Sequence, residues 1–143
     1  MNIWVNGCFD ILHLGHIDLL WFAKLYDTDE DSILLPINQN RLIVGIDSDE
    51  RVKRMKGDKR PINDIVSRVR MMENLMMVDD VVIFDTDNQL KDLIKVFNID
   101  YVIVGSQYRN KEVIGSENAK YGVDFYTVDD RSTTNIIKKI KEL

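Results

Sequence analysis

Residues 7–16 read Gly-Cys-Phe-Asp-Ile-Leu-His-Leu-Gly-His and join a predicted strand to a predicted helix. The strand covers residues 3–6, which are rich in apolar and β-forming types. The helix covers residues 14–25, where the apolar side chains of Ile17, Leu20, Trp21 and Leu25 recur on one stripe. A strand that turns directly into a helix near the start of the chain is typical of an α/β fold.

The rest of the chain continues this alternation. We expect further strands at 42–46, 81–84, 101–104 and 125–128. Helices are expected from Asn63 or Asp64 to about residue 77, from an Asp87 cap to 97, and from Ser132 to 143, with a short helix within 111–121. Continuous apolar strands separated by helices predict a doubly wound, Rossmann-like parallel sheet of about five strands in a single domain. Ligands then bind beyond the carboxyl ends of the strands, in the loops that follow Val5, Ile46, Val104 and Val128.

Composition excludes several classes of protein. The 143 residues are 45% hydrophobic and 30% charged, which fits one compact domain and not a disordered or fibrous chain. The 19 Lys and Arg against 24 Asp and Glu give a net charge of −5, so bulk charge draws the chain to neither nucleic acid nor membrane. No apolar run approaches the roughly 20 residues of a membrane span, and we expect a cytoplasmic protein. Cys8 is alone, which excludes an internal disulfide and a cysteine-based zinc site.

The two histidines carry the most chemical information. His13 and His16 are the only histidines and lie three residues apart, so they share one face at the positive end of a helix. Gly7 lets the chain turn tightly before them, and Gly15 leaves room for a phosphate near the backbone. Two imidazoles and nearby amides can stabilise a phosphate whose charge grows during reaction. The alternative is a pair of surface residues or a chance metal pair. Cys8 is expected to be a small buried residue and not a catalytic thiol.

Three stretches together resemble the cytidylyltransferase-like nucleotidyltransferases with an HxGH motif. They are residues 7–16, the basic stretch 53–63 (Lys-Arg-Met-Lys-Gly-Asp-Lys-Arg-Pro-Ile-Asn) and the run 132–137 (Ser-Thr-Thr-Asn-Ile-Ile). Residues 105–116 and 132–137 are most similar to the heptose 1-phosphate adenylyltransferases. The chain departs from that subgroup at Val104, at Gln107, which replaces an acidic residue, and at Arg131, which replaces an apolar one.

The resemblance implies a reaction and a set of residues. A phosphorylated sugar or alcohol would attack the α-phosphorus of ATP or CTP and expel pyrophosphate, with Mg²⁺ carried by the nucleotide. The catalytic residues would be His13, His16 and Lys56. Nucleotide contacts would come from Gly7, Cys8, Phe9, Asp10, Gly15, Arg68, Gly105, Arg131, Ser132, Thr133 and Thr134. Acceptor contacts would come from Lys53, Arg60, Gln107 and Tyr108. The family also leads us to expect a homodimer.

Several alternatives remain open from the sequence. The basic stretch 53–63 would serve equally as a solvated loop, and the hydroxyls of 132–134 as a simple helix cap. Asp47 and Asp49, after the second strand, could contact nucleotide hydroxyls or hydrated Mg²⁺. A glycerol 3-phosphate cytidylyltransferase is the second enzyme candidate, although such enzymes carry Arg-Thr-Glu-Gly before the Ser-Thr-Thr run. A non-catalytic nucleotide-binding module is the candidate from another class. The segment 26–40 is longer than a usual helix-to-strand connection, and its role is open.

Overall fold

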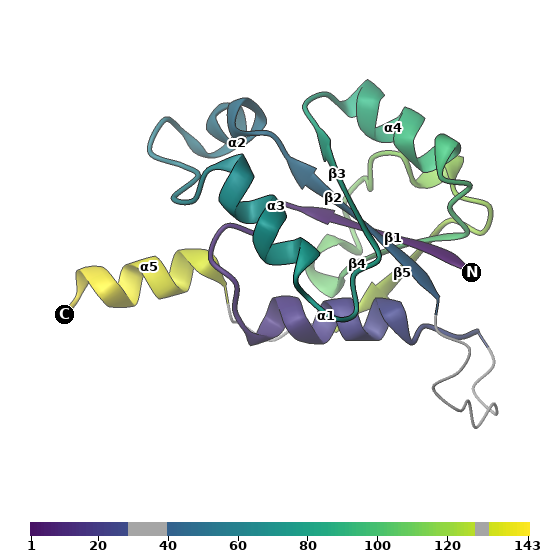
Figure 1. The fold of residues 1–143 in the computed structure, drawn as a ribbon, viewed down its shortest axis with the longest axis horizontal. Helices are drawn as coiled ribbons and strands as arrows, with labels where there is room; N and C mark the ends of the chain where they lie inside the picture. The colour runs from purple at the N-terminus through teal and green to yellow at the C-terminus, as the bar shows by residue number, and fades with distance from the viewer. Residues whose placement is uncertain (29–39, 128–131) are drawn as a thin grey trace.

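A five-stranded parallel sheet forms the centre of the computed structural model, which describes residues 1–28, 40–127 and 132–143 (Figure 1). The strands are β1 (Asn2–Gly7), β2 (Arg41–Asp47), β3 (Asp80–Phe84), β4 (Tyr101–Gly105) and β5 (Val123–Tyr126). Their order is β3-β2-β1-β4-β5, with every neighbouring pair parallel. The chain therefore winds outward in both directions from β1, which confirms the predicted doubly wound α/β class.

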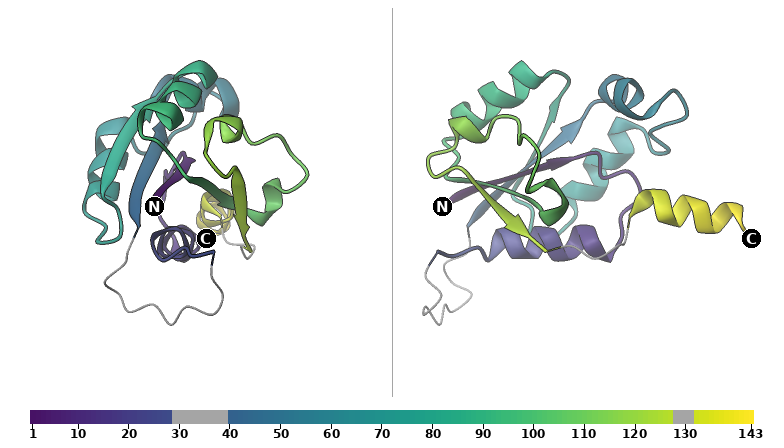
Figure 2. Two further views of the ribbon diagram at one scale, coloured as in Figure 1. Left: turned by 90° about the vertical axis from the view of Figure 1, so that its right-hand side faces the viewer. Right: turned by 180° about the vertical axis from the view of Figure 1, so that it is seen from behind.

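Helices cover both faces of this sheet. They are α1 (Leu14–Lys24), α2 (Asp49–Lys56), α3 (Ile65–Glu73), α4 (Asp87–Val96) and α5 (Thr133–Lys141), with short 3₁₀ turns η2 (Ser106–Tyr108) and η3 (Ser116–Asn118). One core joins α1 and α3 to the sheet through residues such as Leu20 and Met72. A second core, with Trp4 and Leu90, lies under α4 on the opposite face. Figure 2 shows these layers from two further sides.

The carboxyl ends of the strands lie at one edge of the molecule. The loop after β1, the helix α2 after β2 and the beginning of α5 gather there (Figure 1). The switch in winding direction falls between β1 and β4, which pair through Ile3 with Tyr101 and Trp4 with Val102. This edge is where a ligand is expected in such a fold.

Four predicted elements need correction. Residues 53–56 of the basic stretch 53–63 form the end of the helix α2 and not a loop. The helix is stabilised by its Ser48 cap and by Val52, which is buried against the body of the protein. α3 ends at Glu73, four residues before the predicted end, where the Asn74 side chain donates to the Arg70 carbonyl. Thr86 and not Asp87 caps α4. β5 begins at Val123 and not at 125, because its ladder pairs Val123 with Val102.

Two predicted features lie largely outside the described residues. These are Arg131 and most of the 26–40 segment. Within the described ranges, no helix is long and apolar enough to cross a membrane.

Candidate active site

His13 and His16 form a stacked pair at the beginning of α1. His13 caps the helix: its Nδ1 accepts a hydrogen bond from the Gly15 amide at 3.1 Å. The Nδ1 of His16 accepts from the His13 amide at 3.3 Å. The ring centroids lie 3.8 Å apart with 27° between the planes. A neutral imidazole that accepts through Nδ1 carries its hydrogen on Nε2, so these bonds assign an Nε2–H donor to each ring. The Gly15 amide, expected to face a phosphate, is bonded to His13 instead.

His16 is held in its neutral form. Burial, and then the positive charges of His13 and Lys56, lower its pKa from 6.5 to about 4. At neutral pH the ring therefore acts on a phosphate as a hydrogen-bond donor and not as a cation. Positive charge for the transferred phosphate has to come from other side chains.

The tight turn before the histidines is formed by Phe9 and not by Gly7. Phe9 has a φ of 50°, in the left-handed region that non-glycine residues rarely adopt. Its buried ring packs against His16, with centroids 5.3 Å apart. A Cβ on Gly7 would come within 3.3 Å of the same ring. A side chain at position 7 would therefore press on the Phe9 ring, which itself packs against His16.

Asp10 fastens the loop between α2 and α3 to the first loop. Its carboxylate accepts from the amides of Ile62 and Asn63, both at 2.8 Å, and from Arg60 Nε at 3.2 Å. The Asn63 side chain donates to the Asp10 carbonyl at 2.7 Å. The carboxylate is buried and directed at protein groups, so its position favours a structural role over the expected nucleotide contact. Arg60 Nη2 is buried and has no hydrogen-bond partner within the described residues. A buried donor of this kind suits an anionic ligand.

Arg68 lies beneath the crevice and not on its surface. It is 1% exposed and donates to the carbonyls of Asn63, Cys8 and Asp47 and to the Asp49 carboxylate, at 2.7–3.0 Å. Cys8 follows β1, Asp47 ends β2, Asp49 begins α2 and Asn63 precedes α3. The geometry therefore makes Arg68 a positioning residue for those loops. A direct contact with nucleotide, implied by the resemblance, stays a prediction.

Lys56 supplies positive charge near the histidines. It is exposed in the last turn of α2, and its charge lowers the pKa of His16. Lys53 is exposed on the same helix, one turn earlier. Cys8 is half-buried between these groups, and burial raises the pKa of its thiol. A thiol with a raised pKa stays protonated at neutral pH and is a poor nucleophile.

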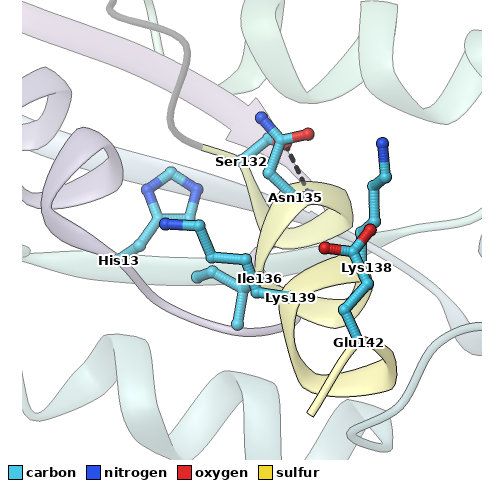
Figure 3. Close-up of a pocket in the computed structure, with 7 residues that line it drawn as sticks. All are labelled: His13, Ser132, Asn135, Ile136, Lys138, Lys139 and Glu142. Atoms are coloured by element: carbon cyan, nitrogen blue, oxygen red, sulfur yellow. Dashed lines mark hydrogen bonds between the residues drawn. The ribbon is translucent and has the colours of Figure 1, made fainter.

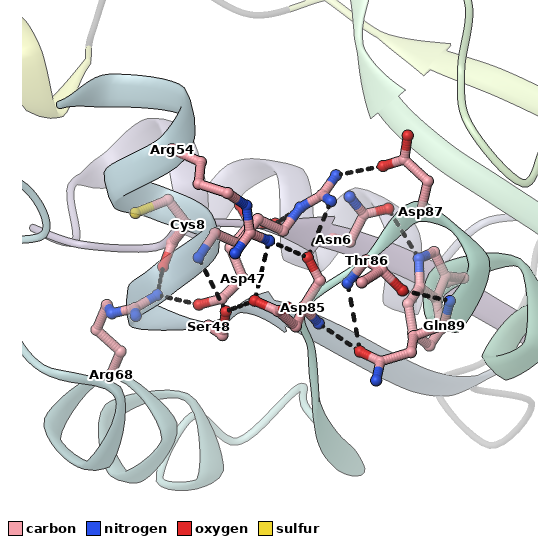
Figure 4. Close-up of polar contacts among 12 residues, drawn as sticks. Asn6, Cys8, Asp47, Ser48, Arg54, Arg68, Asp85, Thr86, Asp87 and Gln89 are labelled. Atoms are coloured by element: carbon pink, nitrogen blue, oxygen red, sulfur yellow. Dashed lines mark hydrogen bonds and ion pairs between the residues drawn. The ribbon is translucent and has the colours of Figure 1, made fainter.

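A polar network joins the ends of β2 and β3 to α2 and α4 (Figure 4). Arg51 donates to the Asp47 and Asp87 carboxylates at 2.9 Å and to the Asp85 carbonyl at 3.2 Å. Ser48 donates to the Asp85 carboxylate at 2.6 Å. Burial raises the pKa of Asp47, although Arg51 acts against that shift. The sequence analysis missed Arg51. Asp47 ends β2 and precedes the Ser48 cap, so this pairing depends on how α2 leaves the strand, and no spacing rule for a single helix would have found it.

The beginning of α5 forms another wall of the crevice. Ser132 caps the helix by accepting from the Asn135 amide at 3.0 Å. Thr133 Oγ1 donates to the Ile11 carbonyl at 2.9 Å and so ties the helix to the first loop. Thr134 is exposed. A pocket of about 500 Å³ lies between this helix and the first loop (Figure 3), lined by His13, Ser132, Asn135, Ile136, Lys138, Lys139 and Glu142.

The predicted residues after β4 lie close together. Gly105 is buried at the end of the strand, and a Cβ there would come within 2.2 Å of Gln107 Oε1. Gln107 folds back over Gly105, and both Gln107 and Tyr108 are exposed in η2. A side chain at position 105 would displace the exposed Gln107 side chain from this place.

No dedicated metal centre is visible in the described part of the chain. No group of three or more His, Cys, Asp or Glu residues there could hold a metal ion. Asp10 accepts hydrogen bonds from Arg60 and from backbone amides, and Asp47 accepts one from Arg51.

The chain is similar to a known protein family and to several known proteins. The profile of the family described as cytidylyltransferase-like matches residues 4–142. The bifunctional protein HldE of Campylobacter fetus is 45% identical over 141 residues, which is 97% of this chain and 28% of that protein. HldE of Nitratiruptor sp. is 43% identical, over 97% of this chain and 27% of that protein. The chain thus spans little more than a quarter of these relatives.

One solved structure has the same fold, at a sequence identity that supports the fold alone. It is the crystal structure of the lipopolysaccharide core biosynthesis protein from Thermoplasma volcanium. It superimposes with a TM-score of 0.66 and 21% identity, over 91% of this chain and 98% of that one.

Proposed function

The chain belongs to the cytidylyltransferase-like family of nucleotidyltransferases, and we propose that it transfers a nucleoside monophosphate from ATP or CTP to a phosphorylated sugar or alcohol. An anionic phosphate oxygen of the acceptor attacks the α-phosphorus. The bond between the α-phosphorus and the oxygen bridging to the β-phosphorus breaks, and pyrophosphate leaves. Because the nucleophile is already an anion, no general base is needed, and positioning and charge stabilisation supply the rate enhancement.

The stacked and oriented pair of histidines is the observation that carries this proposal. Both side chains are oriented by backbone bonds at the beginning of α1, which leaves Nε2–H as the donor of each ring. Lys56 adds a positive charge nearby, and Arg60, which pairs with Asp10, has a buried Nη2 without a hydrogen-bond partner among residues 1–28, 40–127 and 132–143. Donors of fixed orientation together with cations suit a phosphoryl group whose charge increases in the transition state. The substrate is then the Mg²⁺ complex of the triphosphate.

The proposed acceptor is D-glycero-β-D-manno-heptose 1-phosphate, with ATP as donor and ADP-heptose as product. The resemblance of residues 105–116 and 132–137 to heptose 1-phosphate adenylyltransferases supports this choice, as does the similarity to HldE along almost the whole chain. A glycerol 3-phosphate cytidylyltransferase, which makes CDP-glycerol, is the second candidate, supported by the shared histidine and Ser-Thr-Thr motifs. From the family resemblance we also propose that the protein is cytoplasmic and forms a homodimer.

The decisive experiment measures pyrophosphate release from ATP, CTP, GTP and UTP with Mg²⁺, against heptose 1-phosphate and glycerol 3-phosphate. We expect release with one nucleotide and one acceptor, and a loss of about 10²–10³-fold in kcat in His16→Ala, as for removal of one transition-state donor. Gln107→Ala, in η2 directly after β4, tests the acceptor contact separately, because it should alter the acceptor KM and leave the chemical step intact.

The alternatives have distinct outcomes. Release with CTP and glycerol 3-phosphate alone would select the second enzyme. Triphosphate binding without release for any acceptor would favour a non-catalytic nucleotide-binding module. Absence of triphosphate binding would refute the site assignment.

A further inference from the structure

The helix α2, which carries Lys53 and Lys56, is short and makes little apolar contact with the body of the protein. It has eight residues, and Val52 is the one that is buried. Isolated helices shorter than about 12–15 residues are marginally stable in water, so contacts with other elements have to hold α2 in place. Toward α3, the Asp49 carboxylate at the beginning of α2 accepts from Arg68 Nη2 at 2.7 Å. Toward α4, α2 is held by polar contacts with the turn that follows β3.

A single residue of that turn, Asp85, accepts four hydrogen bonds from α2 and its cap. Its carboxylate accepts from Ser48 Oγ at 2.6 Å and from Arg54 Nη2 at 3.0 Å. Its carbonyl accepts from Arg54 Nη2 at 2.8 Å and from Arg51 Nη1 at 3.2 Å. The three donor residues are spaced three apart, which places them on one side of the helix from its cap to its last turn (Figure 4).

Asp85 is itself held by the beginning of α4. Its amide donates to Gln89 Oε1 at 2.7 Å, and the same oxygen accepts from the Thr86 amide at 3.3 Å. Thr86 in turn caps α4 by accepting from the Gln89 amide at 3.1 Å, which completes a capping box. The hydrogen bonds from Ser48 and then from Arg54 lower the pKa of Asp85, so its carboxylate is charged at neutral pH. The capped end of α4 thus provides a fixed point for α2.

The position of α2 determines where Lys56 lies. Lys56 is in the last turn of the helix, two residues after Arg54. Burial is the largest cause of the lowered pKa of His16 and of the raised pKa of Cys8 and Asp47. The charge of Lys56 contributes to the pKa of each of these three groups, so Lys56 lies within electrostatic range of all of them. A shift of α2 would move that charge away from the site.

We propose that Asp85 is a positioning residue that fixes α2, and with it Lys56, relative to the histidine pair. This inference rests on the proposed function and adds a residue outside the three motifs of the resemblance. In that function Lys56 stabilises charge on the transferred phosphate, and a misplacement of about 1 Å can cost roughly 10²-fold in rate. Asp85 acts through α2 and not on the substrate itself.

A solvated surface ion pair is the competing interpretation. The side chains of Arg54 and Asp85 are 54% and 40% exposed, and an exposed pair by itself contributes little. The hydroxyl of Ser48 and the bonds to the Asp85 carbonyl distinguish this contact from such a pair. Asp92, exposed on α4, supplies the matched control. Asp85→Ala and Asp92→Ala change the net charge equally, and only the first removes a carboxylate that holds α2.

The main experiment is a kinetic double-mutant cycle between Asp85 and Lys56. We expect Asp85→Ala to lower kcat about 10-fold and to leave the triphosphate KM within about twofold of the wild type, because Lys56 acts most in the transition state. In a Lys56→Ala background, Asp85→Ala should have no further effect, because the residue through which it acts is gone. Asp85→Asn, which keeps an acceptor for Ser48, should restore most of kcat, and Asp92→Ala should match the wild type. Additive losses in the cycle, or equal kcat in Asp85→Ala and Asp92→Ala, would overturn the inference.

A second measurement does not depend on turnover, so failure of the inference and failure of the proposed function can be told apart. Hydrogen exchange of the α2 amides, followed by mass spectrometry, should be about 10-fold faster in Asp85→Ala than in the wild type or Asp92→Ala. If the wild type shows no turnover with any acceptor, the proposed function is wrong and hydrogen exchange decides the inference alone. Faster exchange confined to α2 supports it. Exchange that is unchanged in α2, or faster throughout the protein, overturns it.

Discussion

The first loop and α5 face each other across one crevice but are held in different ways. The first loop is bonded through the buried side chains of Asp10 and Arg68, which together make at least seven hydrogen bonds to surrounding segments. α5 has no fully buried residue, and Thr133 ties it to the body by a hydrogen bond to the Ile11 carbonyl. Figure 1 shows the helix projecting from the sheet. The site therefore combines a firmly held part, which carries the histidines, with a lightly attached part, which carries the Ser-Thr-Thr run.

Breaking the support of the first loop is expected to have the largest effect. Arg68→Met leaves the carbonyls of Cys8, Asp47 and Asn63 without their donor, which should lower the free energy of unfolding by about 3–5 kcal/mol. Urea denaturation measures the loss. Arg70→Met is the matched control, because Arg70 is exposed on the same helix and should change stability by less than about 0.5 kcal/mol.

The same pair of variants tests the role that the resemblance implies for Arg68. If Arg68→Met is as stable as Arg70→Met and yet loses affinity for triphosphate, Arg68 contacts the nucleotide directly. The positioning role derived from its four bonds would then be wrong.

The partly buried His16, at the beginning of α1, should make stability depend on pH. The pKa of His16 is about 4 in the folded protein against 6.5 ordinarily. Between these values the unfolded chain binds a proton that the folded protein does not, so the free energy of unfolding falls as pH drops from 6.5 to 4. The full contribution is about 3 kcal/mol.

Urea denaturation at several pH values, for the wild type and His16→Gln, measures this contribution. The difference between the two proteins should change by that amount across the window and stay constant above it. Parallel curves for the two proteins would show that His16 titrates normally.

Loosening the tie of α5 should have the smallest effect. Thr133→Val removes the donor to the Ile11 carbonyl, which should cost about 1 kcal/mol and raise the triphosphate KM about 5-fold. Thr134→Val, at an exposed position, is the control. An unchanged KM in Thr133→Val, with the expected loss of stability, would separate the tether from the phosphate site.

Hydrophobic periodicity was sufficient for most of the fold. The strands are runs of apolar residues, α1 is apolar along most of its length, and α4 buries an apolar stripe, so each was predicted within two residues of its observed bounds. α2 was missed because it buries Val52 alone, and its charged sequence is equally typical of a solvated loop. The signals for α2 were local: a Ser48 cap, acidic residues in its first turn, basic residues in its last turn and Gly57 after it.

The predicted position of β5 was wrong by two residues because Asp124 interrupts its apolar pattern. The hydroxyl of Tyr26, distant in the sequence, donates a hydrogen bond to that carboxylate.

The candidate site, too, was predictable from the sequence only in part. The sequence by itself determined the family, the fold class and the local pairing of His13 with His16, because helix spacing and a capping position are local properties of the chain. It could not separate residues that face the crevice from residues that support it. The resemblance assigns Asp10 and Arg68 to the nucleotide together with the histidines, and only the tertiary structure shows both engaged with protein groups. The position of α5 was decided in the same way, since 122 residues separate Ile11 from Thr133 and only folding brings α5 against the first loop.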